Sequence, residues 1–156
     1  MKSLKDKIQE NNIKHYVDGI LVNTDNQILI LRRANYMKQF PGAWGFVGGS
    51  IDKKDNSSKD AIIREIKEET GIELTDNEIK NMFLIETHQH LGGNNDEKIV
   101  SDTEYWLVKL DSNPEIKISR EHSKYEWINE EEIKERKRNF ISDVFHYIEK
   151  YYKNQI

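Results

Sequence analysis

The chain contains no cysteine, so it has neither disulfide bonds nor thiolate metal ligands, and nothing in it requires an oxidising compartment. Long apolar runs are also missing: no stretch approaches the roughly 20 apolar residues that span a bilayer, and the first residues lack the apolar centre of a signal peptide. Excess positive charge is missing too, because the net charge is -4. Nucleic acids and anionic membranes bind largely through basic surface, so neither is an expected partner. We expect a cytoplasmic protein.

The composition that remains is typical of a globular protein. Of the 156 residues, 36% are hydrophobic and 33% are charged, which predicts a strongly solvated surface around one well-formed core. The two prolines, Pro41 and Pro114, fall in apparent loops, and no repeat or linker divides the chain. We therefore interpret residues 1–156 as a single domain.

Apolar runs between turn signals predict the strands of a sheet. A hairpin is expected first, because Tyr16–Val22 and Gln27–Leu31 flank a turn at Asp25 and Asn26. A short strand from Trp44 is then expected to end at Gly48 and Gly49. The remaining expected strands are Phe83–His88, Thr103–Leu110 and Tyr125–Ile128, with a flexible segment from Leu91 to Asp96 between the first two.

Two helices are expected from start and stop signals and from apolar periodicity. The first begins after Ser57, a suitable N-cap with Asp60 three residues on, and ends at Gly71. The second covers Phe140–Tyr152, where apolar residues recur at helical spacing and form one broad face that we assign to the core. Residues Met1–Asn11 predict a short polar helix or an ordered tail.

Three glutamates, Glu65, Glu68 and Glu69, share one face of the first helix because they are spaced i, i+3 and i+4. Carboxylates at this spacing repel one another, and a hard divalent cation would offset the repulsion. Oxygen-only ligands without cysteine favour Mg²⁺, or else Mn²⁺, over zinc. Such helices are often only solvated faces, but here Gly48 and Gly49 lie just upstream, where missing side chains let the backbone approach a ligand or metal.

The segment from Gly49 to Ile72 resembles the Nudix box. The second half of that box has the form R-E-U-x-E-E-x-G-U, with U aliphatic, and REIKEETGI fits it at every defined position. The matching residues are Arg64, Glu65, Ile66, Glu68, Glu69, Gly71 and Ile72. Looser similarity continues at Arg32 and Arg33 and at Glu121 and His122. The resemblance implies an α/β fold, the Nudix-type α/β/α sandwich with a mixed β-sheet between the box helix and the C-terminal helix.

The first half of the segment departs from the box. Counting back from Arg64 aligns Asn56 with the first glutamate of the box, whereas counting on from Gly49 aligns Asp55 with it and leaves one extra residue. We favour a one-residue insertion in this loop, with Asp55 in place of the glutamate. Val47 also replaces the proline that commonly precedes the paired glycines.

The resemblance also implies roles for the box residues. Glu65, Glu68 and Glu69 would hold one or more Mg²⁺ ions, helped by the backbone carbonyl of Gly49 or of the glycine before it. Arg64 would orient the glutamates. The implied reaction is attack of a metal-activated water on one phosphorus of a diphosphate.

The general base is left open, because Nudix enzymes recruit it either from the box or from a separate loop. Glu121 and His122 are the leading loop candidates, since an imidazole that titrates near neutrality suits this role. The alternative for them is a surface pair beside a turn. Glu97 and Glu104 are weaker candidates.

Substrate recognition is expected outside the box. An arginine would meet a phosphate, and an aromatic ring would stack on a base unless it belongs to the core. The candidates are Arg32, Arg33, Tyr36, Phe40 and Trp44. Because the two arginines alternate across a strand, only one should face the cleft. His88 and His90 would share one sheet face, where a substrate-facing or structural role is favoured over a second metal site.

The expected function is Mg²⁺-dependent hydrolysis of the diphosphate linkage of a nucleoside diphosphate derivative, such as ADP-ribose, a sugar nucleotide or a (d)NTP. One alternative is removal of a cap or pyrophosphate from the 5′ end of RNA, which the absence of a basic stripe disfavours. Another is a non-catalytic nucleotide sensor, against which the intact glutamates argue. The expected partner is a small-molecule nucleotide, and the aromatic C-terminal helix leaves a homodimer open.

Overall fold

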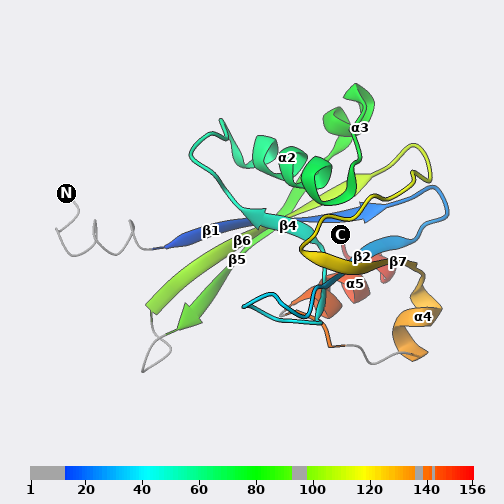
Figure 1. Ribbon diagram of the computed structural model, residues 1–156. Helices are drawn as coiled ribbons and strands as arrows, with labels where there is room; N and C mark the ends of the chain where they lie inside the picture. Colours follow the sequence, from blue (N-terminus) through cyan, green and yellow to red (C-terminus); the bar gives the residue numbers. More distant parts are fainter. Residues whose placement is uncertain (1–12, 93–97, 136–138, 142) are drawn as a thin grey trace.

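The computed structural model describes residues 13–92, 98–135, 139–141 and 143–156 (Figure 1). The helix or tail expected at Met1–Asn11 lies outside these residues, and so does Glu97. Within the described ranges, no helix is long and apolar enough to cross a membrane.

The centre of the fold is a sheet of seven strands in the order β3-β2-β1-β6-β5, with β4 paired to β1 and β7 paired to β2. β1 and β6 run parallel, whereas the other pairs are antiparallel, so the sheet is mixed as expected. The strands are β1 (Lys14–Val22), β2 (Ile28–Arg33), β3 (Trp44–Gly45), β4 (Val47–Ser50), β5 (Phe83–Gly92), β6 (Lys98–Lys109) and β7 (His122–Ile128).

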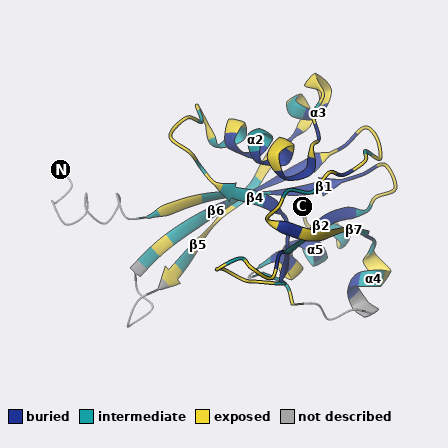
Figure 2. Cartoon of the chain, in the orientation of Figure 1, coloured by how far each residue is buried: buried dark blue, intermediate teal, exposed yellow. Residues whose placement is uncertain are grey.

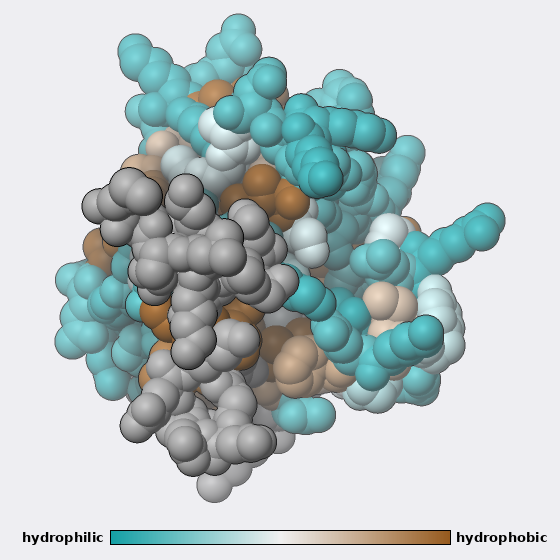
Figure 3. All heavy atoms as spheres, turned by 90° about the vertical axis from the view of Figure 1, so that its left-hand side faces the viewer, coloured by the Kyte–Doolittle hydropathy of each residue, from teal (hydrophilic) through white to brown (hydrophobic). Residues whose placement is uncertain are grey.

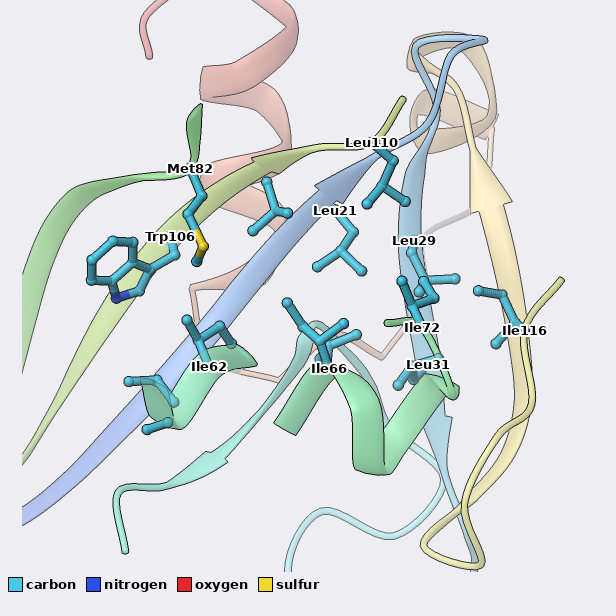
Figure 4. Packing of buried hydrophobic residues seen from close by; sticks show 14 residues of the cluster. Leu21, Leu29, Leu31, Ile62, Ile66, Ile72, Met82, Trp106, Leu110 and Ile116 are labelled. Atoms are coloured by element: carbon cyan, nitrogen blue, oxygen red, sulfur yellow. The ribbon is translucent and has the colours of Figure 1, made fainter. Parts of the chain in front are cut away.

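Helices cover both faces of this sheet (Figure 1). They are α2 (Ser58–Thr70), α3 (Asp76–Asn81), α4 (Glu130–Glu135) and α5 (Val144–Tyr152). One core cluster joins α2 to the sheet, and in Figure 4 Ile62 and Ile66 point from α2 toward Leu21. A second cluster, on the opposite face, contains Tyr147 and Ile148 of α5. The predicted α/β/α sandwich is confirmed.

Strand alternation explains how one sheet supplies two cores. In β2, Leu29 and Leu31 belong to the cluster under α2, whereas Ile28 and Ile30 belong to the cluster under α5. Buried residues accordingly run along the strands between the helices in Figure 2. Among the residues drawn in colour on the face at the left of Figure 1, most are hydrophilic, and hydrophobic residues gather near the centre of the view (Figure 3).

The local signals of the box helix are confirmed. The Ser57 hydroxyl accepts a hydrogen bond from the backbone N–H of Asp60 at 3.1 Å, and the N–H of Gly71 donates to the carbonyl of Lys67 at 2.9 Å. The hairpin is confirmed too, with Val22 opposite Ile28. Local hydrogen-bonding signals therefore fixed the ends of α2 correctly.

Several predicted boundaries were wrong because long-range pairing extends or replaces local structure. The strand expected to end at Gly48 and Gly49 continues to Ser50, which lies opposite Tyr16 of β1. β5 and β6 pair as far as Gly92 and Lys98, so part of the segment expected to be flexible is strand. The C-terminal helix begins only at Val144, because the backbone on either side of Phe140 bonds to Trp44.

α3 was not anticipated from the sequence. It has a capping box, in which the Thr75 hydroxyl accepts from the N–H of Glu78 while the Glu78 carboxylate accepts from the N–H of Thr75. The spacing of threonine and glutamate is the sequence signal that predicts such a start.

Candidate active site

A pocket of about 1390 Å³ opens where β4, the start of β1 and helix α2 meet. Six carboxylates line it: Asp18 from β1, Asp52 from the loop after β4, Glu65, Glu68 and Glu69 from α2, and Glu121 from the loop before β7. A pocket of this size is large enough for a drug-sized or nucleotide-sized ligand. Its acidic lining requires something to offset the repulsion between the carboxylates.

The three glutamates of α2 do not occupy one environment. Glu65 and Glu69 are one turn apart on the face of α2 that packs on the sheet, and the Glu69 side chain is only 6% exposed. Glu68 is 58% exposed and its carboxylate accepts a hydrogen bond from Arg64 at 3.2 Å. The helix therefore buries two of its carboxylates and leaves the third at the pocket rim.

Glu69 is held by two partners from other elements. The backbone N–H of Gly48 donates to Glu69 Oε1 at 2.7 Å, and His122 Nε2 lies 3.3 Å from Glu69 Oε2. Burial raises the pKa of Glu69 to about 9, against the Gly48 hydrogen bond, and the neighbouring charge of Glu65 adds to the increase. Burial, together with Arg33, lowers the pKa of His122 to about 4. Near neutral pH both partners therefore favour their uncharged forms.

Glu65 and Asp18 complete the buried group, which we call the carboxylate cluster: Asp18, Glu65 and Glu69. Both glycines of β4 make room for it. A Cβ atom at Gly49 would lie 2.5 Å from Glu65 Oε1, and one at Gly48 would lie 2.2 Å from Asp18 Oδ1. Burial raises the pKa of Asp18 to about 7, with help from Glu65, and burial also raises the pKa of Glu65.

Arg64 links helix α2 to the loop between β4 and α2. Its Nε donates to Asp55 Oδ1 and its Nη2 donates to Asp55 Oδ2, both at 2.9 Å, and its Nη1 donates to Glu65 at 3.0 Å. The bond from Arg64 lowers the pKa of Asp55, and the same pairing raises the pKa of Arg64. Because Asp55 rather than Asn56 receives this bidentate contact, the geometry favours Asp55 as the counterpart of the first box glutamate.

The two loop candidates for a general base lie in different surroundings. His122 is buried against Glu69, and its lowered pKa makes it a weak base. Glu121 is exposed, lines the pocket, and contributes to the raised pKa of Glu65 and Glu69. Glu104 accepts a hydrogen bond from Ser58 at 2.9 Å, at the start of α2.

The five candidate substrate-binding residues separate into two groups. Arg33 and Phe40 line the pocket. Arg32 does not line it and donates instead to the carbonyl of Gly42 at 3.2 Å, as expected for alternating neighbours. Tyr36 is 70% exposed outside the pocket lining, and Trp44 belongs to the core cluster under α5.

A hard divalent cation fits the residues at this site. The donors are carboxylate oxygens, and burial raises the pKa values of three of them, Asp18, Glu65 and Glu69, with neighbouring carboxylates adding to the increase. The glycine backbone of β4 approaches two of these carboxylates more closely than any side chain would permit. Oxygen ligands of this kind suit Mg²⁺ or Mn²⁺.

Asp18 is the residue of the site that the sequence prediction missed. Its signal is a charged residue inside the apolar run of β1, between Val17 and Ile20. A lone acid in a strand is hard to assign, however, until its strand partner is known. Here that partner is Gly48.

Comparisons with known proteins identify the family of this chain. A sequence model of the NUDIX domain matches residues 14–148. The nucleoside triphosphatase NudI of Escherichia coli is 28% identical over 116 residues, covering 72% of this chain and 80% of its own length. The fold resembles the NUDIX domain of Shewanella oneidensis NrtR, crystallised with ADP ribose, at a TM-score of 0.71 and 21% identity, with 92% and 89% of the two chains covered.

A second structural relative is a bifunctional NMN adenylyltransferase/ADP ribose pyrophosphatase from Francisella tularensis, in complex with AMP and a Mn ion. Its TM-score is 0.69 at 22% identity, and the match covers 91% of this chain and 42% of that one. The match to the NUDIX domain extends over most of the chain, and REIKEETGI lies on the pocket-lining helix. This chain therefore belongs to the Nudix family and is an enzyme of the Nudix hydrolase type.

Proposed function

We propose that this protein is a Mg²⁺-dependent hydrolase that cleaves the diphosphate linkage of a nucleoside diphosphate derivative. One observation carries the proposal: α2 buries Glu65 and Glu69 beside Asp18 in the wall of an open pocket. A buried cluster of like charges is costly unless a cation balances it. A diphosphate brings further negative charge, so the same cation would serve both groups.

In this proposal Glu65, Glu68 and Glu69 hold Mg²⁺ or Mn²⁺, with Asp18 and the carbonyl of Gly49 as further oxygen donors. When bound, the ion supplies charge neutralisation at the phosphate oxygens and a lowered pKa for an attacking water. The Mn ion beside AMP in the Francisella relative is compatible with this cation class.

The remaining residues of the site position groups or move a proton. Arg64, fixed by Asp55, orients Glu65 and Glu68 through its donor groups. His122 orients Glu69. We assign the general base to Glu121, because it is an exposed carboxylate of the pocket lining, where an attacking water could reach it.

The substrate side of the proposal rests on the opposite part of the pocket. Arg33 would donate hydrogen bonds to a phosphate. Its Nε already donates to the carbonyl of Gln39 at 2.8 Å, so the two terminal nitrogens of the guanidinium group would contact the phosphate. Phe40, which is exposed in the pocket lining, would stack on a base. ADP-ribose, sugar nucleotides and (d)NTPs all offer both groups.

The test is turnover of a substrate panel with Mg²⁺, with products separated by chromatography. The panel contains ADP-ribose, nucleotide sugars, dinucleotides and (d)NTPs. The Glu69→Gln variant should lose about a hundredfold or more of the activity on the best substrate, which is the scale of several kcal/mol of lost charge stabilisation.

Glu73→Gln is the matched control, because Glu73 follows the same helix but is exposed and pairs with Lys67 at 3.1 Å. Its activity should equal that of the wild type. Undiminished turnover by Glu69→Gln would refute the assignment of the site. Tight binding of one nucleotide without any turnover would favour the nucleotide-sensing alternative.

A further inference from the structure

A second group of metal-ligating side chains lies beside the pocket, between β5 and the start of α5. His88 and His90 of β5 and Asp143, directly before α5, each offer one ligand atom, and these atoms lie within 4.8 Å of one another. It is the one group of three such side chains that meets this spacing within the described part of the chain. We propose that this histidine cluster binds a divalent cation of the zinc class.

The strand and the helix explain why the three side chains meet. His88 and His90 are two residues apart, so their side chains leave β5 on the same face, and their rings lie 4.9 Å apart between centroids. His88 Nε2 is 3.3 Å from Asp143 Oδ2. Two ligands bound to one zinc ion at about 2.0–2.2 Å lie roughly 3–3.5 Å apart, which this pair already satisfies.

The position of Asp143 is set by an anchor one helical turn further on. Tyr147 is buried, stacks on Tyr105 at 3.9 Å between centroids, and donates a hydrogen bond to Glu86. Glu86 precedes His88 by two strand residues, about 6.6 Å, and Tyr147 follows Asp143 by four helical residues, about 6 Å. Two residues forward along the strand therefore cover about the same distance as one turn back along the helix, and the Glu86–Tyr147 contact holds Asp143 near His88.

The donor set selects the kind of ion. Two imidazoles and one carboxylate suit Zn²⁺, Co²⁺ or Ni²⁺, whereas Mg²⁺ prefers oxygen donors and retained water. Three protein ligands also leave a coordination position open. Thr103 Oγ1 lies 3.3 Å from His90 Nε2 and orients that ring, as outer partners commonly do at metal sites.

The histidine cluster is reachable from solution and borders the pocket. The side chain of His88 is 46% exposed and that of Asp143 is 31% exposed. His90, Thr103 and the adjacent Val144 belong to the pocket lining. The cluster is nevertheless built from different elements than the carboxylate cluster, so its ion binding is independent of the proposed hydrolysis.

The test is binding of Zn²⁺, and of Co²⁺ as a coloured probe, to tag-free protein in excess Mg²⁺, which occupies the oxygen donors. We expect one ion per chain by titration calorimetry and a visible absorption band from bound Co²⁺. The variant His88→Asn/His90→Asn should bind at least about tenfold more weakly and lose the band. Absence of binding to the wild type in excess Mg²⁺ would overturn the proposal.

Two further variants distinguish the histidine cluster from other sites. His146→Asn removes an exposed histidine of α5 outside the cluster and should bind as the wild type does. Glu69→Gln should also keep the band; its loss there would assign the ion to the carboxylate cluster and refute the inference. Melting temperatures without metal serve as the folding control, and Asp143→Asn, which alters neither histidine, should weaken binding in the same direction.

Discussion

The carboxylate cluster and the histidine cluster place metal-ligating side chains at two parts of the same pocket, but in different surroundings. Asp18, Glu65 and Glu69 are crowded between β1, β4 and α2, and burial raises their pKa values. His88 and Asp143 lie partly in water beside α5, with His88 Nε2 3.3 Å from Asp143 Oδ2. In the first cluster burial therefore disfavours the charged carboxylates, whereas in the second the donor atoms already lie at metal-ligand spacing.

This difference teaches that two separate signs point to a metal site. One is energetic: carboxylates that are buried close together identify a place where a cation would stabilise the fold. The other is geometric: mixed nitrogen and oxygen donors already stand at ligand spacing. Changes that disturb the first cluster should leave the second intact, and each of the following expectations tests that separation.

The largest effect is expected from Gly49→Ala. The added Cβ would lie 2.5 Å from Glu65 Oε1 and must displace that carboxylate, so activity should fall by about a hundredfold. Ser50→Ala, at the exposed next position of β4, is the control and should retain activity. Zinc binding at the histidine cluster should be unchanged in both. Full activity of Gly49→Ala would mean that Glu65 has no role in the reaction.

His122 gives a smaller effect that separates positioning from base catalysis. His122→Ala leaves Glu69 without its Nε2 contact and should lower kcat about tenfold with little change in KM. His122→Gln places an amide donor near the lost nitrogen and should recover part of the rate, with the pH profile unchanged. An altered pH profile in either variant would instead identify His122 as the base.

A substitution of Arg64 tests the contact between the loop after β4 and helix α2. Arg64→Lys cannot make the two-pronged contact with Asp55, and the melting temperature should fall by about 2–4 °C. Lys67→Ala breaks only an exposed pair with Glu73 and should change it less. Equal melting temperatures for the two variants would remove Asp55 as the structural counterpart of the box glutamate.

The last expectation concerns how the stability of the metal-free protein depends on pH. The pKa of Glu69 is raised from its ordinary value of 4.5 to about 9 in the folded protein, and the pKa of Asp18 is raised from 3.8 to about 7. Between the ordinary and the raised value of each group, the folded state holds a proton that the unfolded state has released. Stability should therefore fall as pH rises from about 5 to 9, by less than about 1.4 kcal/mol per pH unit for each group.

Denaturant unfolding at several pH values measures this slope. Between pH 7 and 9 this slope should be close to zero in the Glu69→Gln variant and should remain in the His88→Asn variant. Between pH 6.5 and about 4 the contribution of His122 has the opposite sign, because burial lowers its pKa to about 4, so acidification through that range removes its part of the stability and offsets some of the gain from the carboxylates. A flat profile from pH 7 to 9 in the wild type would mean that the carboxylate cluster is ionised without metal.

Much of the fold and part of the site were predictable because their signals are local. Ser57, Gly71 and the apolar stripe between them specify α2 within a few residues of sequence. The box pattern then identified Glu65 and Glu69. What it did not predict is that the same stripe buries both carboxylates while Glu68 stays exposed, because burial depends on how the helix packs on the sheet.

The rest depends on contacts between distant segments. Asp18 joins the site through strand pairing with Gly48, and His122 reaches Glu69 across a long stretch of chain. The sequence is equally compatible with Trp44 as a residue that stacks on a base and as a core residue. Its neighbours in the structure assign it to the core cluster under α5. Periodicity does predict that His88 and His90 share a face, but it does not predict that Asp143 lies beside them.

The pairing of β1 with β4 makes the chemistry conditional on correct folding. Asp18 lies opposite Gly48, and Val17 lies opposite Gly49. A shift of one residue would reverse the face of every side chain in β1, turning Asp18 into the core and Val17 toward the pocket. A chain with the shifted register would then be inactive rather than partly active. The specific activity of a preparation therefore reports the fraction of molecules in which β1 and β4 are correctly paired.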